Sequence, residues 1–85
     1  MQTFEHTVRA AVGLHARPAG LLVKEARKYQ SRITLSAGGK SAEATKLMAL
    51  MAMGVRCGTA VTVTVEGPDE AECAEKIRGF MEENL

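Results

Sequence analysis

The stretch Gly13–Gly20, which reads GLHARPAG, decides how the rest of this chain is organised. Pro18 is typical of the first turn of a helix, because proline lacks the N–H that would have no acceptor there and its fixed φ suits a helix start. Apolar positions with helical spacing follow it, so we expect a helix from Ala16 to about Lys28. The stretch therefore predicts a loop that ends, and a helix that begins, beside His15.

His15 and Arg17 indicate anion chemistry at this predicted helix start. The first N–H groups of a helix have no intrahelical acceptor and carry partial positive charge, so the amides of Ala16 and Arg17 can bind an oxyanion. The same positive end disfavours imidazolium, which leaves His15 neutral and nucleophilic, and a guanidinium suits phosphate oxygens. The motif predicts a histidine that accepts a phosphoryl group. A capping histidine beside a surface arginine is the alternative.

At these residues the chain resembles the histidine-containing phosphocarrier protein HPr of the bacterial phosphotransferase system, and the similarity runs over essentially the whole chain in one register. The matching segments are residues 13–19, 24–26, 39–40, 47–54 and 67–70. The resemblance implies that phosphorylated enzyme I, whose phosphate comes from phosphoenolpyruvate, phosphorylates His15 on Nδ1. It further implies that Arg17 holds the group and that the IIA domain of a sugar permease receives it, so the permease selects the sugar.

Length and composition are compatible with the resembled family, and we expect a soluble, cytoplasmic protein. Eighty-five residues make one domain, residues 1–85, with a modest core. A formal charge of +1, three aromatic residues and no tryptophan give no reason to expect nucleic-acid binding. We see neither a signal peptide nor an apolar run near the roughly 18 residues of a membrane span, so we expect no membrane partner. The two cysteines are expected to be reduced thiols.

Alternating apolar residues predict the strands. In residues 2–8, Phe4, His6 and Val8 share one face, so we expect His6 to be a satisfied, partly buried core histidine rather than a ligand. Further strands are predicted at 32–36, 41–43 and 59–66, with residues 37–40 forming the hairpin turn.

The first predicted helix has two faces. Its apolar stripe is Ala19, Leu22, Val23 and Ala26. Its basic face is Arg17, Gly20, Lys24 and Arg27, which by itself indicates only a solvated surface. The resemblance implies that this face meets acidic rims on enzyme I and the IIA domains, which makes Lys24 and Arg27 docking candidates. Gly20 is either a place for close approach of a partner or a tolerated glycine.

Residues 47–53, LMALMAM, predict a short helix that is apolar almost all round and is followed by Gly54 as its C-cap. Such a helix cannot bury every side chain in so small a domain, and methionine suits surfaces that meet several partners. We assign Leu50 and Met53 to the core. The resemblance favours an exposed docking patch beside His15, made of Leu47, Met48 and Met51.

The chain departs from the resembled family at Lys46. Many relatives from Gram-positive bacteria carry there a serine that a dedicated kinase phosphorylates, and lysine cannot accept that modification. Thr45 is expected to be the N-cap of the short helix, with phosphorylation of its hydroxyl as the weaker alternative. A regulatory role is therefore less well supported than the carrier role.

The C-terminal segment predicts a helix that starts in a capping box, with Asp69 as the cap and Glu72 as its partner. Its expected core face is Cys73, Ala74, Ile77, Phe80 and Met81. Cys73 then acts as a small buried hydrophobic residue, and Cys57 lies in a loop. The histidines and cysteines have no zinc-ligand spacing, so we expect neither a bound metal nor a cofactor.

The predicted order of elements is βαββαβα, which indicates an α+β open-faced β-sandwich. It would have a four-stranded, mostly antiparallel sheet with three helices on one face. We expect a monomeric phosphocarrier rather than an enzyme in the usual sense. The alternative is a regulatory binding module of the same fold that acts through protein partners. A small-molecule hydrolase is a third class, but no acid–base pair supports it.

Overall fold

A single antiparallel sheet forms the body of the protein. The computed structural model describes residues 1–11, 13–14 and 16–85, so Val12 and His15 lie outside the described residues. The strands are β1 (Gln2–Thr7), β2 (Arg32–Ala37), β3 (Lys40–Glu43) and β4 (Ala60–Glu66), in the order β1-β4-β2-β3. All three pairings are antiparallel, where we expected mostly antiparallel ones.

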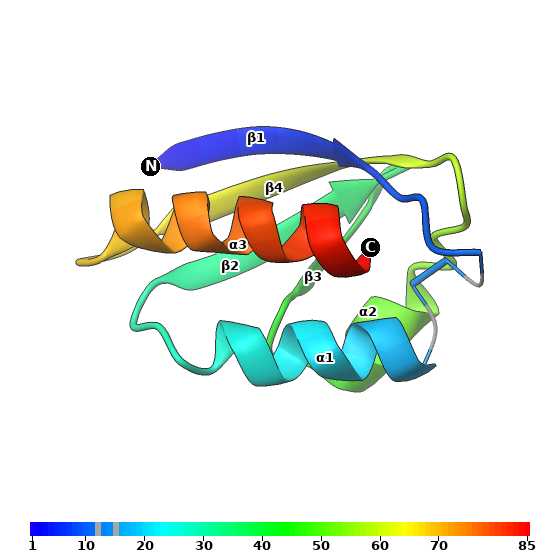
Figure 1. Cartoon of the computed structure of the whole chain (residues 1–85), viewed down its shortest axis with the longest axis horizontal. Helices are drawn as coiled ribbons and strands as arrows, with labels where there is room; N and C mark the ends of the chain where they lie inside the picture. The colour runs from blue at the N-terminus through cyan, green and yellow to red at the C-terminus, as the bar shows by residue number, and fades with distance from the viewer. Residues whose placement is uncertain (12, 15) are drawn as a thin grey trace.

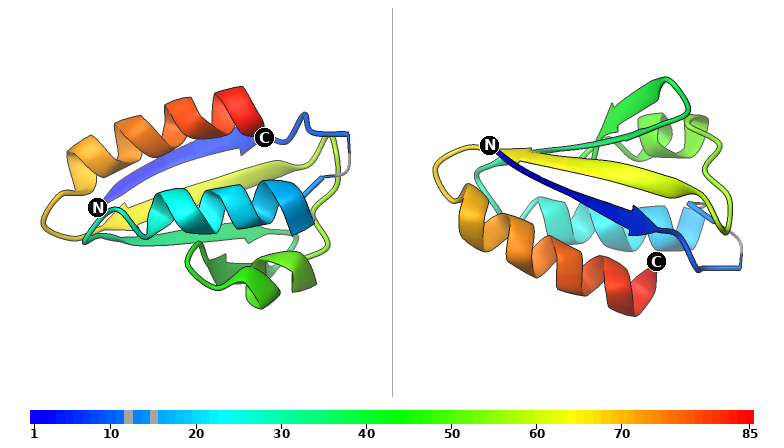
Figure 2. Two further views of the ribbon diagram at one scale, coloured as in Figure 1. Left: turned by 60° about the horizontal axis from the view of Figure 1, so that its bottom comes forward. Right: turned by 90° about the horizontal axis from the view of Figure 1, so that it is seen from above.

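Three helices complete the predicted βαββαβα order: α1 (Ala16–Ala26), α2 (Leu47–Ala52) and α3 (Glu70–Asn84). Helices α1 and α3 cover one face of the sheet, and α2 packs against α1 and β3 (Figures 1 and 2). The opposite face of the sheet is left open, as expected for an open-faced β-sandwich. None of the described helices is long and apolar enough to cross a membrane.

Side-chain alternation across the paired strands explains why one face is buried. One cross-strand row consists of Phe4, Val63, Leu35 and Ala42, all of them buried. The next row lies on the open face and consists of Thr3, Thr64, Thr34 and Glu43, which are exposed or half-buried. The helices supply the rest of the core, and the predicted stripe of α1 is fully confirmed.

His6 is buried between the sheet and the helices, as its position in β1 predicted. The expectation that it would be satisfied is wrong: its Nε2 has no hydrogen-bond partner in the described part of the chain. Its neighbours along this face of β1 and β4, Phe4 and Val61, have no polar side-chain atoms. The ring fills core volume instead.

Asp69 stands at the N-cap position of α3 but does not act as the predicted capping-box residue. Its carboxylate accepts hydrogen bonds from the backbone N–H of Gln30, at 3.1 Å, and from the hydroxyl of Ser31. These bonds, above all the one from Ser31, hold the pKa of the Asp69 carboxyl below its usual range. Asp69 therefore ties the start of α3 to the end of the α1–β2 loop.

Gly67 allows this tie, because its backbone passes directly over Ser31. A Cβ at position 67 would lie 2.6 Å from the Cα of Ser31, and the φ of Gly67 is +153°. The side chain of Glu70, rather than Glu72, reaches back to the N–H of Gly67, at 3.3 Å. The capping partners predicted from local spacing are thus both replaced.

The core face of α3 is otherwise as predicted. Cys73, Ala74, Ile77 and Met81 are buried, and Phe80 is partly buried against the core. Burial raises the pKa of the Cys73 thiol to about 11, so it behaves as a small apolar side chain. Cys57 is exposed and unpaired with Cys73, as expected for two free thiols.

Thr45 is not the N-cap of α2, contrary to our expectation. The cap is Lys46, in an extended conformation and without a side-chain cap bond. The N–H of Lys46 donates to the carbonyl of Glu43 at 3.0 Å, which closes a turn directly after β3. That turn delays the helix by one residue. At the other end, Gly54 has a φ of +68° and follows the C-cap residue Met53, so it occupies the position that favours glycine.

Candidate functional site

The loop before α1 is fixed by its backbone. The N–H of Gly13 donates to the carbonyl of Ala10 at 2.8 Å, and the N–H of Leu14 donates to the carbonyl of Val55 at 3.0 Å. Gly13 has a φ of +67°, and a Cβ there would lie 2.4 Å from the Val55 oxygen. Only glycine permits this approach. Leu14 is buried, so the loop enters the core immediately before position 15.

Helix α1 begins immediately after position 15, at Ala16. Pro18 lies in the first turn, as predicted, and is buried with Ala19, which anchors the helix start to the core. Ala16 and Arg17 are exposed, and their N–H groups belong to the first turn, where no intrahelical acceptor exists. His15 itself lies outside the described residues. The structure therefore defines the two segments that flank the predicted acceptor.

The predicted basic residues lie on the exposed face of α1 and, for Arg27, in the turn directly after it. Arg17, Lys24 and Arg27 are exposed, whereas Lys28 pairs with Glu25 at 3.0 Å. The hydrogen bond from Lys28 lowers the pKa of the Glu25 carboxyl. Among residues 1–11, 13–14 and 16–85, none of the three exposed cations forms an ion pair. Their charge is left unneutralised on the surface that leads away from Ala16.

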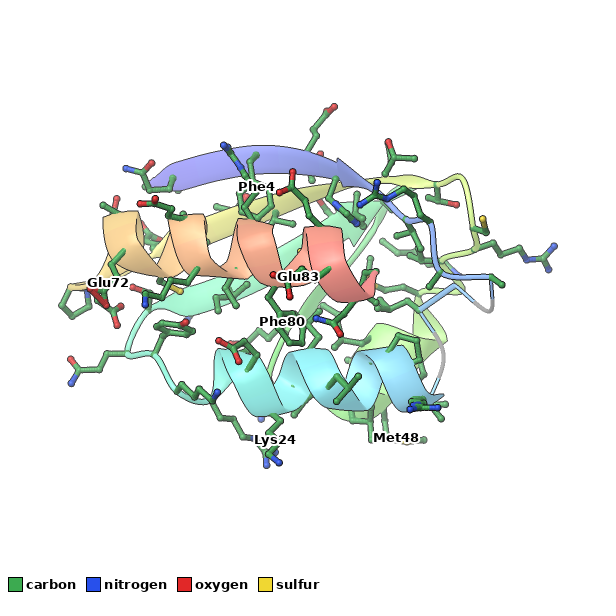
Figure 3. The ribbon with its side chains drawn as sticks, viewed as in Figure 1. Phe4, Lys24, Met48, Glu72, Phe80 and Glu83 are labelled. Carbon is green, nitrogen blue, oxygen red and sulfur yellow. The ribbon has the colours of Figure 1, made fainter. Side chains whose placement is uncertain are left out.

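Helix α2 places part of its apolar surface next to this basic face. Met48 is 76% exposed and Leu47 is 37% exposed, while Leu50 and Met53 are buried, as predicted. Met51 is only half-buried and packs partly on the core, so it is less exposed than we expected. Because α2 packs against α1, Met48 and Lys24 project from the same side of the molecule (Figure 3).

Comparison with known proteins agrees with this geometry. The family model described as "PTS HPr component phosphorylation site" matches residues 2–83. The chain belongs to the HPr family.

Among the relatives of this HPr-family chain, the HPr-like protein Crh of Bacillus subtilis is 41% identical over 92% of each chain. The phosphocarrier protein HPr of Vibrio cholerae is 41% identical over 89% of each chain. The solved HPr of Thermoanaerobacter tengcongensis matches with a TM-score of 0.93 and 33% identity, over 99% of this chain and 94% of that one. A crystal structure of Crh, described as a dimer with a swapping domain, matches with a TM-score of 0.78 and 39% identity over 100% and 98% of the two chains.

Leu21 is an exposed apolar residue of this HPr-family site that the sequence reasoning missed. It is 42% exposed and lies four residues after Arg17, on the outer face of α1. The signal was available, because position 21 lies outside the stripe of Ala19, Leu22, Val23 and Ala26 and yet carries leucine. A large apolar side chain on the solvent face of a helix is a candidate contact residue.

The described part of the HPr-family chain has no group of three or more His, Cys, Asp or Glu side chains that could hold a metal ion. Among the described residues at the start of α1, the polar groups are the first-turn backbone N–H groups and the Arg17 guanidinium. All of these attract anions.

Proposed function

We propose that this chain is a phosphocarrier that accepts a phosphoryl group on His15 from phosphorylated enzyme I and passes it to the IIA domain of a sugar permease. The observation that carries the proposal is the match of residues 2–83 to the HPr phosphorylation-site family. The start of α1 supports it, because Ala16 and Arg17 present first-turn N–H groups and an exposed guanidinium next to position 15.

In the proposed step, a neutral imidazole nitrogen of His15 attacks the phosphorus atom. The new N–P bond forms as the bond from phosphorus to the donor breaks, and the donor keeps that electron pair. The amides of Ala16 and Arg17 and the Arg17 guanidinium hold the three phosphoryl oxygens. In the transfer to the IIA domain, an acceptor on that domain attacks the phosphorus atom, the N–P bond to His15 breaks, and His15 keeps the electron pair. The chain is returned unchanged, so it acts as a carrier and needs no metal or cofactor of its own.

The proposed docking surface combines the exposed faces of α1 and α2. It comprises Gly20, Leu21, Lys24, Leu47, Met48 and Met51 of these helices, together with Arg27 directly after α1. The unpaired cations suit acidic rims on enzyme I and the IIA domains, and the adaptable methionines suit contact with more than one partner.

Labelling tests the carrier proposal directly. Incubation with phosphoenolpyruvate, enzyme I and Mg²⁺ should give an acid-labile, base-stable phosphate on the wild-type protein and none on His15→Ala. The control variant His6→Gln changes the other histidine, and under conditions in which it is folded it should be labelled as the wild type is. Label on His15→Ala, or none on the wild type, would overturn the proposal.

A charge reversal tests the docking surface. Lys24→Glu should raise the KM for enzyme I about tenfold or more, because a like charge then faces the acidic rim. Lys76→Glu makes the same change on an exposed residue of α3 and should leave KM unchanged. Equal effects of the two variants would show that net charge, and not this surface, governs the encounter.

The second candidate is a regulatory binding module of the same fold. One observation favours it: the HPr-like protein Crh matches the chain at the same 41% identity as the Vibrio cholerae HPr. Such a module would bind a protein partner tightly without passing phosphate to a IIA domain. Because Lys46 has no hydroxyl, a serine kinase of the family should give no product, and stoichiometric label on Thr45 would favour the regulatory candidate.

We further propose that the carrier works in the cytoplasm as a monomer, the state in which β1 pairs with β4 of its own chain. The Crh crystal structure shows why this needs a test, since it is a dimer with a swapping domain. Light scattering at micromolar concentration should give the mass of one chain. A stable dimer that takes up label would correct the assembly and leave the carrier role intact.

A further inference from the structure

A second arginine, Arg56, has its backbone beside the loop that precedes α1, although it belongs to a segment far from that loop in the sequence. The backbone of Val55 and Arg56 packs against Gly13, so that a Cβ at position 13 would be 2.8 Å from the Cα of Arg56. The hydrogen bond from the N–H of Leu14 to the carbonyl of Val55 locks the two segments together. Arg56 is thus attached to the loop that leads directly into position 15.

The turn that carries Arg56 is held on both sides. The N–H of Thr59 donates to the carbonyl of Arg56 at 3.1 Å, and the Arg56 N–H donates to the Thr59 hydroxyl at 3.4 Å. The N–H of Gly58 donates to the carbonyl of Val8 at 2.7 Å. With its backbone anchored in this way, Arg56 keeps its position beside Gly13.

The side chain of Arg56 is left available by the fold. It is exposed, and it forms no ion pair within the portion that the structure describes. Arg9, the neighbouring arginine, is different, because its guanidinium donates to the carbonyl of Glu82 at 2.6 Å and so closes the end of α3. Of these two arginines, Arg56 is the one that no described group engages.

We propose that Arg56 is a second ligand of the phosphoryl group on His15, contributed by the segment packed against Gly13 and Leu14, in addition to Arg17 from α1. The inference rests on the proposed carrier function. A guanidinium gives two parallel hydrogen bonds to phosphate oxygens, and a second guanidinium stabilises the phosphoryl dianion further over the monoanion. Arg56 binds the group and takes no proton from it.

The pKa of the phosphoryl group on the isolated phosphoprotein tests this role in the absence of any partner. Phosphorus NMR across a pH series should show that Arg56→Gln raises the phosphohistidine pKa by about half a unit to one unit, since an opposite charge has been removed. Arg17→Gln should raise it by as much or more. Arg32→Gln, which removes an exposed arginine paired with Glu43, should leave it unchanged.

Each outcome decides the matter. A raised pKa for Arg56→Gln but not Arg32→Gln, with an unchanged thermal midpoint, supports the assignment. A labelled Arg56→Gln whose phosphate pKa equals that of the wild type overturns it, and a higher KM for enzyme I in that case shows that Arg56 only docks the partner. If the wild type takes no label at all, the carrier proposal has failed and this inference fails with it.

Discussion

Each end of the sandwich has a glycine at which two backbone segments meet, but different groups hold the segments together at the two ends. Gly13 at one end and Gly67 at the other each let two backbone segments approach more closely than any side chain would allow. At the Gly67 end, side chains complete the closure, because the Asp69 carboxylate is occupied by Gln30 and Ser31. At the Gly13 end, backbone hydrogen bonds from Gly13 to Ala10 and from Leu14 to Val55 hold the loop.

The difference shows how a small domain separates stability from function. At the Gly67 end, the charged carboxylate of Asp69 is engaged by hydrogen bonds that hold the fold, so it is not available to a ligand. Where backbone hydrogen bonds hold the loop, the neighbouring side chains of Arg17 and Arg56 keep their hydrogen-bonding capacity for a ligand. The comparison predicts that changes at the Gly67 end affect stability alone, and that changes at the Gly13 end affect both stability and phosphoryl uptake.

The largest effect is expected when each glycine receives a side chain. Gly13→Ala and Gly67→Ala should each lower the free energy of unfolding by about 1–3 kcal/mol, because both force a Cβ against backbone atoms. Urea unfolding measures this loss. Under conditions in which both variants are folded, only Gly13→Ala should be labelled more slowly by enzyme I. Normal labelling of Gly13→Ala would contradict the predicted difference between the two ends.

Acid should weaken the Gly67 end selectively. The pKa of Asp69 is lower in the folded protein than in the unfolded chain, so its contribution is present above the ordinary carboxyl pKa of about 4 and is lost as the pH falls through the folded value. Asp69→Asn should be less stable than the wild type at pH 7, and the gap should close towards pH 2. Urea midpoints over this range test it. A gap independent of pH would contradict the role of the carboxylate.

Gly20 in α1 and Gly79 in α3 form a matched pair that separates an effect on stability from an effect on partner binding. Neither would bring a Cβ within 4 Å of another group, so Gly20→Ala in α1 and Gly79→Ala in α3 should each stabilise the protein by about 1 kcal/mol. Only Gly20→Ala should raise the KM for enzyme I, provided that a partner approaches α1 closely there. An unchanged KM would identify Gly20 as merely a tolerated glycine.

The smallest effect is expected at Thr45. Because Lys46 is the cap of α2 and Thr45 makes no cap bond, Thr45→Ala should change the free energy of unfolding by less than about 0.5 kcal/mol. A true N-cap threonine would cost about 1 kcal/mol. Thermal or urea unfolding distinguishes these values, and a loss of the larger size would restore Thr45 as a capping residue.

Local spacing predicted most elements, because it needs only the periodicity of one segment. Alternating Val61, Val63 and Val65 identified β4, and the Ala19–Ala26 stripe identified the buried face of α1. The predictions failed where a group had a choice of partners. Asp69 had the spacing of a capping box, yet its carboxylate bonds to residues 38 and 39 positions away.

The amino-acid sequence by itself determined the order of elements, the candidate acceptor and the basic face of α1, because these follow from residue types at short spacing. Only the tertiary structure decided the strand order, the partner of Asp69, the exposure of Leu21 and the position of Arg56 beside Gly13. The reason is physical. Periodicity records which side of a segment is apolar, whereas contacts between distant segments depend on how all the apolar faces are buried together.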